Sequence, residues 1–248
     1  MHRFFVTERI EGIGAEVTLS KEESVHAARV LRLKAGEPVA LLDGEGLYAG
    51  ILTHVSEQGT RACIAEALPS PEPDMQVTLV QGLPKADKLE MIVQKATELG
   101  AWAITPVEMA RCVAKADKQG KKRERYQRIA LEAAKQSGRA HVPEVGETVN
   151  FAGFCRKAEA NAFDVVFVAW EEEHALPLSK ALCALQEAGK PLQRIAVVIG
   201  PEGGITAEEC ERLKALGAVS VTLGRRILRT ETAGLCALSV IWAACGEM

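Results

Sequence analysis

The chain has 248 residues, which predicts one to two domains at about 150 residues per domain. Apolar residues make up 48% and charged residues 25%, so the composition is that of a globular protein and argues against disorder, collagen and coiled coil. The 30 basic and 33 acidic residues give a net charge of −3, so any contact with nucleic acid must come from local basic patches.

The N-terminal residues and the cysteines indicate the compartment. Residues 1–5 lack the apolar core of a signal peptide, and the longest apolar-rich run, 235–245, is shorter than the roughly 20 residues that span a bilayer. The seven cysteines are scattered, and none forms a Cys-x-x-Cys pair. We therefore expect a cytoplasmic protein with buried, reduced thiols, no membrane segment and no metal site.

A proline-rich segment, 68–74, divides the sequence into a smaller and a larger domain, because three prolines in five residues fit neither a helix nor a central strand. Before it, glycine-containing turns separate three apolar or alternating runs, which predicts a small β-barrel with strands at 37–42, 47–55 and 61–67. One helix interrupts the barrel. It starts at a Ser-x-x-Glu capping box, Ser20 with Glu23, and ends near Val30.

Residues 75–248 alternate between strand and helix patterns, which predicts βαβ units and a mostly parallel sheet in an α/β fold. The expected strands are 77–81, 103–107, 165–169, 195–199 and 219–223. The expected helices are 87–99, capped by Asp87 and Glu90, and then 124–136, 178–187, 206–216 and 230–244. Ligands bind such sheets at the carboxyl ends of the strands, so the strand-to-helix loops are the candidate sites.

The loop 199–206 follows a strand of the buried type and opens a helix. Its three glycines within five residues would let the backbone amides approach a ligand, and the alternative is a tight turn with Thr206 as the helix N-cap. It matches neither a P-loop nor a Gly-x-Gly-x-x-Gly fingerprint. A second loop, 170–174, is an acidic turn in which Trp170 is either a pocket wall or, as we favour, a core residue.

The loop 223–233 has the same position after a strand and before a helix. Its three arginines within five residues suit contacts with phosphate or a nucleobase, and Thr230 is the predicted cap of the next helix. The alternative is a solvated loop with incidental cations. We favour the binding interpretation, because Ile227 and Leu228 would be costly to expose and could line a pocket.

The stretch 115–128 carries seven cations and two acids, a local charge of +5, with Tyr126 among them. This pattern suits contacts with a phosphate backbone and stacking on a base, and the alternative is a solubilising helix face. The contrast with a chain of net charge −3 favours binding. Residues 2–5, with His26, Arg29 and Arg32, form a weaker second basic patch.

Six segments together resemble the bacterial RsmE family, the 16S ribosomal RNA uridine-N3 methyltransferases of the knotted SPOUT class, which use S-adenosylmethionine. They occur in the family's order across nearly the whole chain, at 2–5, 26 with 30–32, 85–90, 95–100, 200–204 and 223–233. The resemblance implies an α/β fold with a deep trefoil knot in a C-terminal domain, 75–248, and a PUA-like RNA-binding β-barrel at 1–70. It also implies a homodimer that acts on the small ribosomal subunit.

The resemblance further implies that the cofactor lies against three loops and that no metal is required. The cofactor-binding residues would be Trp170, Ile199, Gly200, Pro201, Gly203, Gly204, Leu223, Gly224, Ile227 and Leu228. The candidate RNA-binding residues are Arg3, His26, Arg29, Arg32, Lys121, Lys122, Arg123, Arg125, Arg225 and Arg226.

Uridine N3 carries a proton and lies between two carbonyls, so the site must help to remove the proton and stabilise the charge that spreads to the oxygens. Arg229 is our candidate for the second task. Glu231 is a candidate base or orienting group and Glu202 is its rival, although a carboxylate at a helix start can simply accept bonds from backbone amides. The alternative functions are methylation of a ribose 2′-oxygen or another base, a non-catalytic rRNA-binding assembly factor, and a small-molecule nucleotide-binding enzyme.

Overall fold

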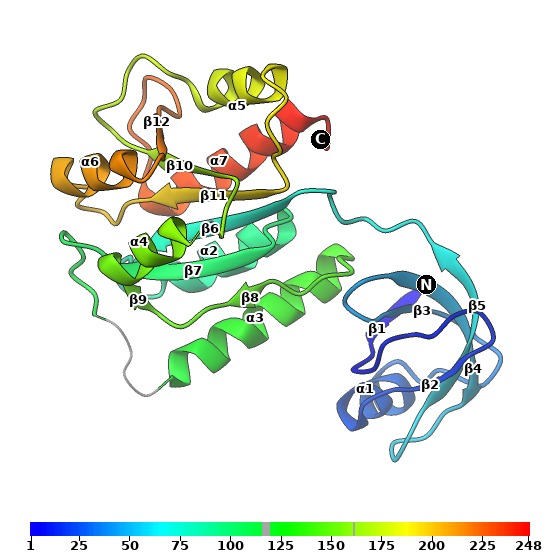
Figure 1. Ribbon diagram of the computed structural model, residues 1–248. Helices are drawn as coiled ribbons and strands as arrows, with labels where there is room; N and C mark the ends of the chain where they lie inside the picture. The colour runs from blue at the N-terminus through cyan, green and yellow to red at the C-terminus, as the bar shows by residue number, and fades with distance from the viewer. Residues whose placement is uncertain (116–119, 161) are drawn as a thin grey trace. The chain divides into compact units, whose positions relative to one another are not determined.

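The computed structural model describes residues 1–115, 120–160 and 162–248, and the chain forms two units (Figure 1). The first unit contains 1–72 and 134–142, and the second contains 73–133 and 143–248. The division after residue 72 falls within the proline-rich segment, whereas the sequence gives no sign that 134–142 joins the first unit. The helix α3, Lys121–Ser137, is shared between the two units.

The first unit is a curled sheet, in which the described residues form five strands (Figure 1). The order is β1-β3-β4-β5-β2; β1 pairs with β3 in parallel and the other neighbours are antiparallel. Its core includes Phe4, Leu41, Leu52 and Ile64. The three predicted strands are present, and β1 and β2 are additional. The strands are β1 His2–Phe5, β2 Glu16–Thr18, β3 Pro38–Leu42, β4 Leu47–His54 and β5 Arg61–Leu68.

The predicted helix of the first unit begins as expected and then changes form. The Ser20 hydroxyl accepts a hydrogen bond from the Glu23 amide at 3.2 Å, and α1, Lys21–Val25, follows. The chain continues as a π-helical turn, η1, His26–Val30. The Glu23 carboxylate lies 2.6 Å from Lys135 Nζ, so it serves an ion pair within the first unit instead of the predicted capping box.

A buried ion pair holds the proline-rich segment to residues 134–142. Arg139 is 6% exposed, and its Nη2 lies 2.5 Å from Glu72 Oε2. Glu72 Oε1 also accepts hydrogen bonds from the amides of Ala140 at 2.7 Å and His141 at 3.0 Å. Burial opposes ionisation of Glu72, but Arg139 and the two amides outweigh it and hold the pKa of this carboxyl below its usual value.

The second unit is a parallel sheet with helices on both faces (Figure 1). Among the described residues the strand order is β12-β10-β11-β6-β7-β8, β9 also pairs with β7, and all the pairings are parallel. This confirms the predicted α/β arrangement. The strands are β6 Gln76–Gly82, β7 Ala103–Glu108, β8 Glu144–Val145, β9 Val149–Asn150, β10 Val165–Ala169, β11 Arg194–Ile199 and β12 Val219–Val221.

The remaining helices cover the two faces of this sheet. They are α2 Lys88–Glu98, α4 Phe151–Glu159, α5 Leu178–Glu187, α6 Ala207–Ala215 and α7 Thr230–Cys245. α7 packs against α2, α5, β6 and β11 on one face. On the other face, Phe154 of α4 and Leu213 of α6 join Val80, Val168 and Val198 in one apolar cluster. Burial on both faces explains why these strands are continuous apolar runs in the sequence.

Several predicted details are wrong. β12 ends at Val221 instead of residue 223, because Thr222 pairs with Pro177 in an isolated parallel bridge, where the Thr222 amide donates to Leu176 O at 2.8 Å. Asp87 occupies the N-cap position of α2, but its side chain makes no capping hydrogen bond. The short strands β8 and β9 and the helix α4 are absent from the prediction. No helix in the described part of the chain is long and apolar enough to cross a membrane.

Candidate active site

The segments that follow β10, β11 and β12 meet at the carboxyl edge of the sheet. Ala169 pairs with both Ile199 and Val221, so the three strands end level with one another. Together with the start of α2, the three segments form a cavity of about 600 Å³. It is lined by Lys88, Ala169, Trp170, Glu171, Ile199, Gly200, Pro201, Glu202, Gly203, Gly204, Thr222, Leu223, Gly224, Arg226, Ile227, Leu228, Arg229, Thr230 and Ala233.

This cavity brings together most of the predicted site residues. All ten predicted cofactor-binding residues line it, and so do Glu202, Arg226 and Arg229. Glu231 and Arg225 are not among the lining residues. The sequence interpretation missed Lys88, although it lies within the motif 85–90, and it also missed Ala169, Glu171, Thr222, Thr230 and Ala233.

Close backbone contacts explain the glycines around the loop that follows β11. A Cβ on Gly82, at the end of β6, would lie 2.6 Å from Pro201 N, and a Cβ on Gly200 would lie 2.9 Å from Ile205 Cγ1. Both distances are shorter than side chains tolerate, so only glycine allows β6 and this loop to approach. Thr206 then caps α6 in a complete capping box. The loop is thus a tight turn and also a cavity wall, so the two interpretations of its sequence are compatible.

Thr230 differs from its predicted role. It is the first residue of α7, whose N-cap is Arg229, and its side chain does not cap the helix. Its buried hydroxyl donates to Gly200 O at 2.6 Å and accepts from Gln81 Nε2 at 2.8 Å. The Gly200 carbonyl would lose this hydrogen bond if the Thr230 hydroxyl capped α7, and a carbonyl out of contact with water is costly to leave without a donor. The hydroxyl fixes the start of α7 to β6 and β11.

Lys88 connects the two candidate bases. Its Nζ lies 3.0 Å from Glu202 Oε1 and 3.1 Å from Glu231 Oε2. The Lys85 amide also donates to the Glu202 carboxylate, at 3.1 and 3.2 Å. Between these residues Ala86 takes a left-handed backbone, φ 54°, which is unfavourable for a residue with a Cβ. The bonds to Glu202 therefore hold a strained loop at the edge of the cavity.

These contacts set the ionisation of both carboxyls. Partial burial of Glu202 opposes its charge, but its own backbone amide, Lys88 and the Lys85 amide outweigh burial and lower its pKa. The pKa of Glu231 is lowered chiefly by its own amide in the first turn of α7, with Lys88 adding to the effect. Hydrogen bonds to Glu202 and Glu231 raise the pKa of Lys88. The cluster is one ammonium held between two ionised carboxylates.

Two side chains at the cavity are exposed to solvent. The Arg229 side chain is 82% exposed, and its Nη1 lies 4.0 Å from Glu231 Oε1. Ile227 is 79% exposed. An isoleucine exposed to this extent at a cavity is the arrangement expected where a bound molecule covers it.

Trp170 contributes to both the cavity and the core. Its indole Nε1 donates to Ile205 O at 3.2 Å, and the half-buried ring packs against the apolar cluster beneath α4 and α6. It also lines the cavity. Nearby, Glu173 Oε1 accepts from the Ala175 amide at 2.8 Å, as expected for a solvated acidic turn.

The basic stretch lies at the N-terminal half of α3. Lys122, Arg123 and Arg125 are exposed there, and the side chain of Lys121 and residues 116–119 lie outside the described residues. Arg123 Nε donates to Val145 O at 3.1 Å, and Arg125 Nη2 lies 2.7 Å from Glu90 Oε2. Glu90, which the sequence assigned to the cap of α2, is therefore used in an ion pair.

The other four candidate RNA-binding residues lie in the first unit. Arg3, His26, Arg29 and Arg32 are exposed. The His26 ring meets Phe4 edge to face at 6.4 Å, and the Arg3 guanidinium packs against Gly138. Among the described residues, no group of three or more His, Cys, Asp or Glu side chains is placed to hold a metal ion.

Comparisons with known proteins identify the class of protein, a methyltransferase of RNA. Residues 70–242 match the family model described as an RNA methyltransferase domain. A crystal structure of a ribosomal RNA small subunit methyltransferase E from Neisseria gonorrhoeae, bound to S-adenosylmethionine, is 31% identical, with a TM-score of 0.81 over 98% of this chain and 97% of that one. A putative methyltransferase from Legionella pneumophila, in complex with the same cofactor, is 30% identical, with a TM-score of 0.74 over the same shares.

Curated relatives identify the family more closely. The ribosomal RNA small subunit methyltransferase E of Bacillus subtilis is 39% identical over 247 residues, which cover 97% of this chain and 96% of the relative. The chain belongs to the ribosomal RNA small subunit methyltransferase E (RsmE) family.

Proposed function

We propose that this protein transfers the methyl group of S-adenosylmethionine to N3 of a specific uridine in 16S rRNA of the small ribosomal subunit. One observation carries the proposal: the ten positions assigned to the cofactor from sequence all line one cavity, at the sheet edge where α/β proteins bind ligands. The relatives named for small-subunit rRNA methylation, and two of similar fold bound to the cofactor, support it.

The cavity suits this cofactor in size and chemistry. A volume of about 600 Å³ is within the roughly 300–1,000 Å³ range of small-molecule sites. Leu223, Ile227 and Leu228 provide apolar contacts, and the glycines of 200–204 bring backbone groups to the cavity. When bound, the cofactor supplies an activated methyl group on a sulfonium. The residues of this chain must position the acceptor against it and manage the proton and charge of that acceptor.

Arg229 is the residue best placed to stabilise charge on the uracil. Loss of the N3 proton spreads negative charge onto the two carbonyl oxygens, and a guanidinium donates two hydrogen bonds to such a group. The side chain lies at the cavity and is exposed, so it can turn toward a bound base. We assign it this role.

Glu231 and Glu202 are the candidate bases, and Lys88 weakens both as proton acceptors. Each carboxyl has a lowered pKa and an ammonium as partner, which makes it a weak proton acceptor. We infer that the N3 proton passes to one of them only when Lys88 shifts its hydrogen bond to the other. In the arrangement described, the pair orients Lys88 beside the cavity.

Further features of the proposal follow from the family resemblance. We infer that 75–248 is a SPOUT domain with a deep trefoil knot, and the parallel sheet of the second unit supports the α/β part of this inference. Residues 1–70 would form a PUA-like RNA-binding barrel, supported by the curled sheet of the first unit. We also propose a homodimer with α7 as the candidate contact helix, and a cytoplasmic location, where the rRNA substrate occurs.

The test uses purified protein, S-adenosylmethionine labelled in its methyl group, and small ribosomal subunits that lack the modification. Digestion of the RNA and mass analysis of its nucleosides then identify the product. We expect label in 3-methyluridine. Label in a 2′-O-methylated or another nucleoside would support methyltransferase activity but reject the assignment of N3 as the acceptor atom. If the protein neither transfers the methyl group nor binds the cofactor in calorimetry, the proposed function would change from an enzyme to a non-catalytic rRNA-binding factor.

A further inference from the structure

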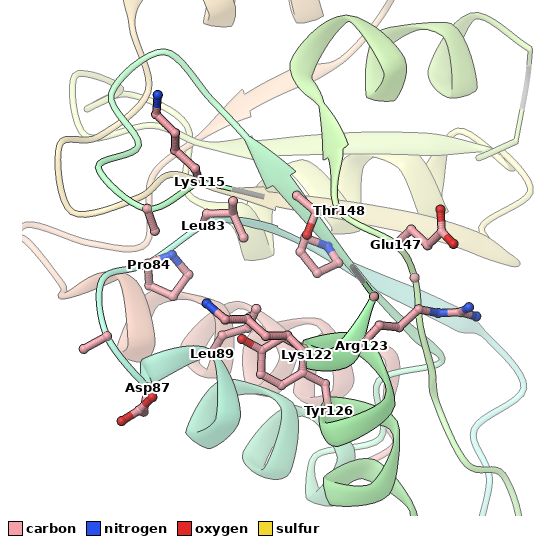
Figure 2. Close-up of a pocket in the computed structure, with 15 residues that line it drawn as sticks. Leu83, Pro84, Asp87, Leu89, Lys115, Lys122, Arg123, Tyr126, Glu147 and Thr148 are labelled. Atoms are coloured by element: carbon pink, nitrogen blue, oxygen red, sulfur yellow. The ribbon is translucent and has the colours of Figure 1, made fainter. Parts of the chain in front are cut away.

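A second pocket, of about 300 Å³, lies at the carboxyl ends of β6, β7 and β8 (Figure 2). It is formed by the segment after β6, the start of α2, β7 with the described part of the segment that follows it, the first turns of α3, and the segment between β8 and β9. It shares no lining residue with the larger cavity. Its lining residues are Leu83, Pro84, Ala86, Asp87, Leu89, Pro106, Ala114, Lys115, Gly120, Lys122, Arg123, Tyr126, Gly146, Glu147 and Thr148.

One wall of this pocket combines an aromatic ring with a cation. Lys122 and Tyr126 are four residues apart on α3, so they lie on the same face of the helix. Figure 2 shows both side chains projecting from α3 toward the side formed by Pro84. Tyr126 is half-buried, whereas Lys122 is exposed. A half-buried ring beside an exposed ammonium suits a ligand with a flat apolar face and an anionic group.

The charges favour an anion at the Lys122 side of the pocket. Three cations and two carboxylates line it, in a chain of net charge −3. Figure 2 shows the carboxylates of Asp87 and Glu147 at opposite sides of the pocket, pointing outward. Arg123 is directed toward β8, where its Nε donates to Val145 O at 3.1 Å. Among the described cations that line the pocket, Lys122 is the one on the same helix face as Tyr126.

The pocket has the size of a site for one nucleotide. Its volume of about 300 Å³ is at the lower limit of small-molecule sites. Leu83, Pro84 and Leu89 add apolar surface beside the Tyr126 ring, and Thr148 adds a hydroxyl. Unstacked bases in single-stranded RNA are recognised by this combination of aromatic stacking, hydrogen bonding and phosphate contact.

The two pockets are adjacent along one sheet edge. Asp87 lines the smaller pocket and Lys88 lines the larger cavity, so consecutive residues, about 3.8 Å apart at Cα, separate them. Hydrogen bonds from the Lys85 amide to Glu202 fix this segment. An RNA strand with one nucleotide at the cavity can therefore place a neighbouring nucleotide at the smaller pocket.

We propose that the smaller pocket binds a nucleotide of the substrate RNA that flanks the methylated one. Its base stacks on Tyr126 and its phosphate lies at Lys122. This inference rests on the proposed function for the identity of the RNA. It adds a recognition site, separate from the cofactor cavity, through which the enzyme reads the strand next to its target.

The test compares full-length Tyr126→Ala and Tyr126→Phe proteins on small ribosomal subunits that lack the modification. We expect Tyr126→Ala to lower kcat/KM for the subunits by about 5- to 150-fold, the loss associated with one stacked base, while Tyr126→Phe keeps the wild-type value within about threefold. The calorimetric Kd for S-adenosylmethionine should not change in either variant, which separates a lost nucleotide contact from a disturbed fold. Unchanged kcat/KM in Tyr126→Ala would overturn the proposal.

A charge control and a cross-link complete the test. Lys122→Gln should weaken subunit binding, whereas Lys180→Gln, which removes an exposed cation outside both pockets, should not. Ultraviolet cross-linking and mass spectrometry should join Tyr126 to a nucleotide next to the methylated one. A cross-link to the methylated nucleotide itself, or to a distant one, would contradict the flanking assignment.

Failure of the proposed function would be recognised separately. If the wild-type protein transfers no methyl group to subunits, a labelled oligouridylate still tests the pocket by fluorescence anisotropy. Weaker binding by Tyr126→Ala than by Tyr126→Phe would support a nucleotide site, and equal binding would reject it.

Discussion

The cavity beside Lys88 and the pocket beside α3 lie along one edge of the same sheet but are built from different groups. Glycine backbone, the buried Thr230 hydroxyl and an ammonium held between two carboxylates shape the cavity. Exposed lysines and one half-buried ring shape the pocket. The first arrangement has a fixed form that suits one small molecule, whereas the second can adapt to a flexible, charged polymer.

The largest effect is expected from Arg229→Ala, at the cavity. Loss of one preorganised donor to a developing oxyanion typically lowers kcat by about 10²–10³-fold. Arg229 lines the cavity, but its side chain is 82% exposed, so its loss should change the rate of transfer far more than the Kd for S-adenosylmethionine. Single-turnover methyl transfer to small subunits measures the first quantity and calorimetry the second. Arg229→Lys should recover part of the rate. Full turnover by the alanine variant would show that Arg229 has no catalytic role.

The fixed form of the cavity is tested by Thr230→Val. The substitution keeps the shape of the side chain but leaves Gly200 O without its side-chain donor and one N–H of the Gln81 amide without an acceptor, while Gln81 Nε2 keeps its bond to Gly82 O. Each unsatisfied buried group costs about 1–3 kcal/mol, so denaturant unfolding should show a loss of at least about 1 kcal/mol and cofactor affinity should fall. Thr230→Ser, which keeps the hydroxyl, is the control. A valine variant as stable as the wild type would mean that these bonds contribute nothing.

The charge cluster is tested by Lys88→Met and the pH dependence of methyl transfer. Both carboxyls have a lower pKa in the folded protein than in the unfolded chain, so their ionised forms stabilise the fold. This stabilisation is present above pH about 4.3 and is lost as the pH falls through the folded-state pKa. Without the ammonium these pKa values rise. The acid limb of the kcat/KM profile should therefore move to higher pH. Lys88→Arg should retain the wild-type limb, and an unmoved limb in Lys88→Met would show that neither carboxyl is coupled to turnover.

The smallest effect is expected in the salt dependence of subunit binding. Lys122→Gln removes one phosphate contact, so the slope of log K against log salt concentration should fall by about 0.7. Cofactor affinity should show little salt dependence in the same protein. Filter binding at four salt concentrations gives the slope. A variant with the wild-type slope would place Lys122 away from the RNA backbone.

The sequence predicted the sheet of the second unit well because its strands are buried on both faces. β10 and β11 read as uninterrupted apolar runs between glycines and helix signals, and both are present within one residue of the expected bounds. β2 and β8, with three and two residues, are too short for such a pattern. α4 has no separate signal either, because Gly153 lies inside it.

Contacts between distant residues account for what the sequence missed at the site. Thr230 bonds to Gln81, 149 residues away, and Lys88 bonds to Glu231, 143 residues away. Local patterns gave Thr230 a capping role, since a threonine before a helix usually has one. The loops themselves were found because glycine and arginine clusters at strand ends are local features.

Hydrogen exchange of the full-length protein with and without S-adenosylmethionine tests the distinction between the two pockets most directly. The cofactor should slow exchange at the amides of 199–206 and 222–229, most of whose residues line the cavity, and leave those of 120–126, at the pocket beside α3, unchanged. Protection of 120–126 without protection of 199–206 would place the cofactor in the pocket beside α3 and contradict the account.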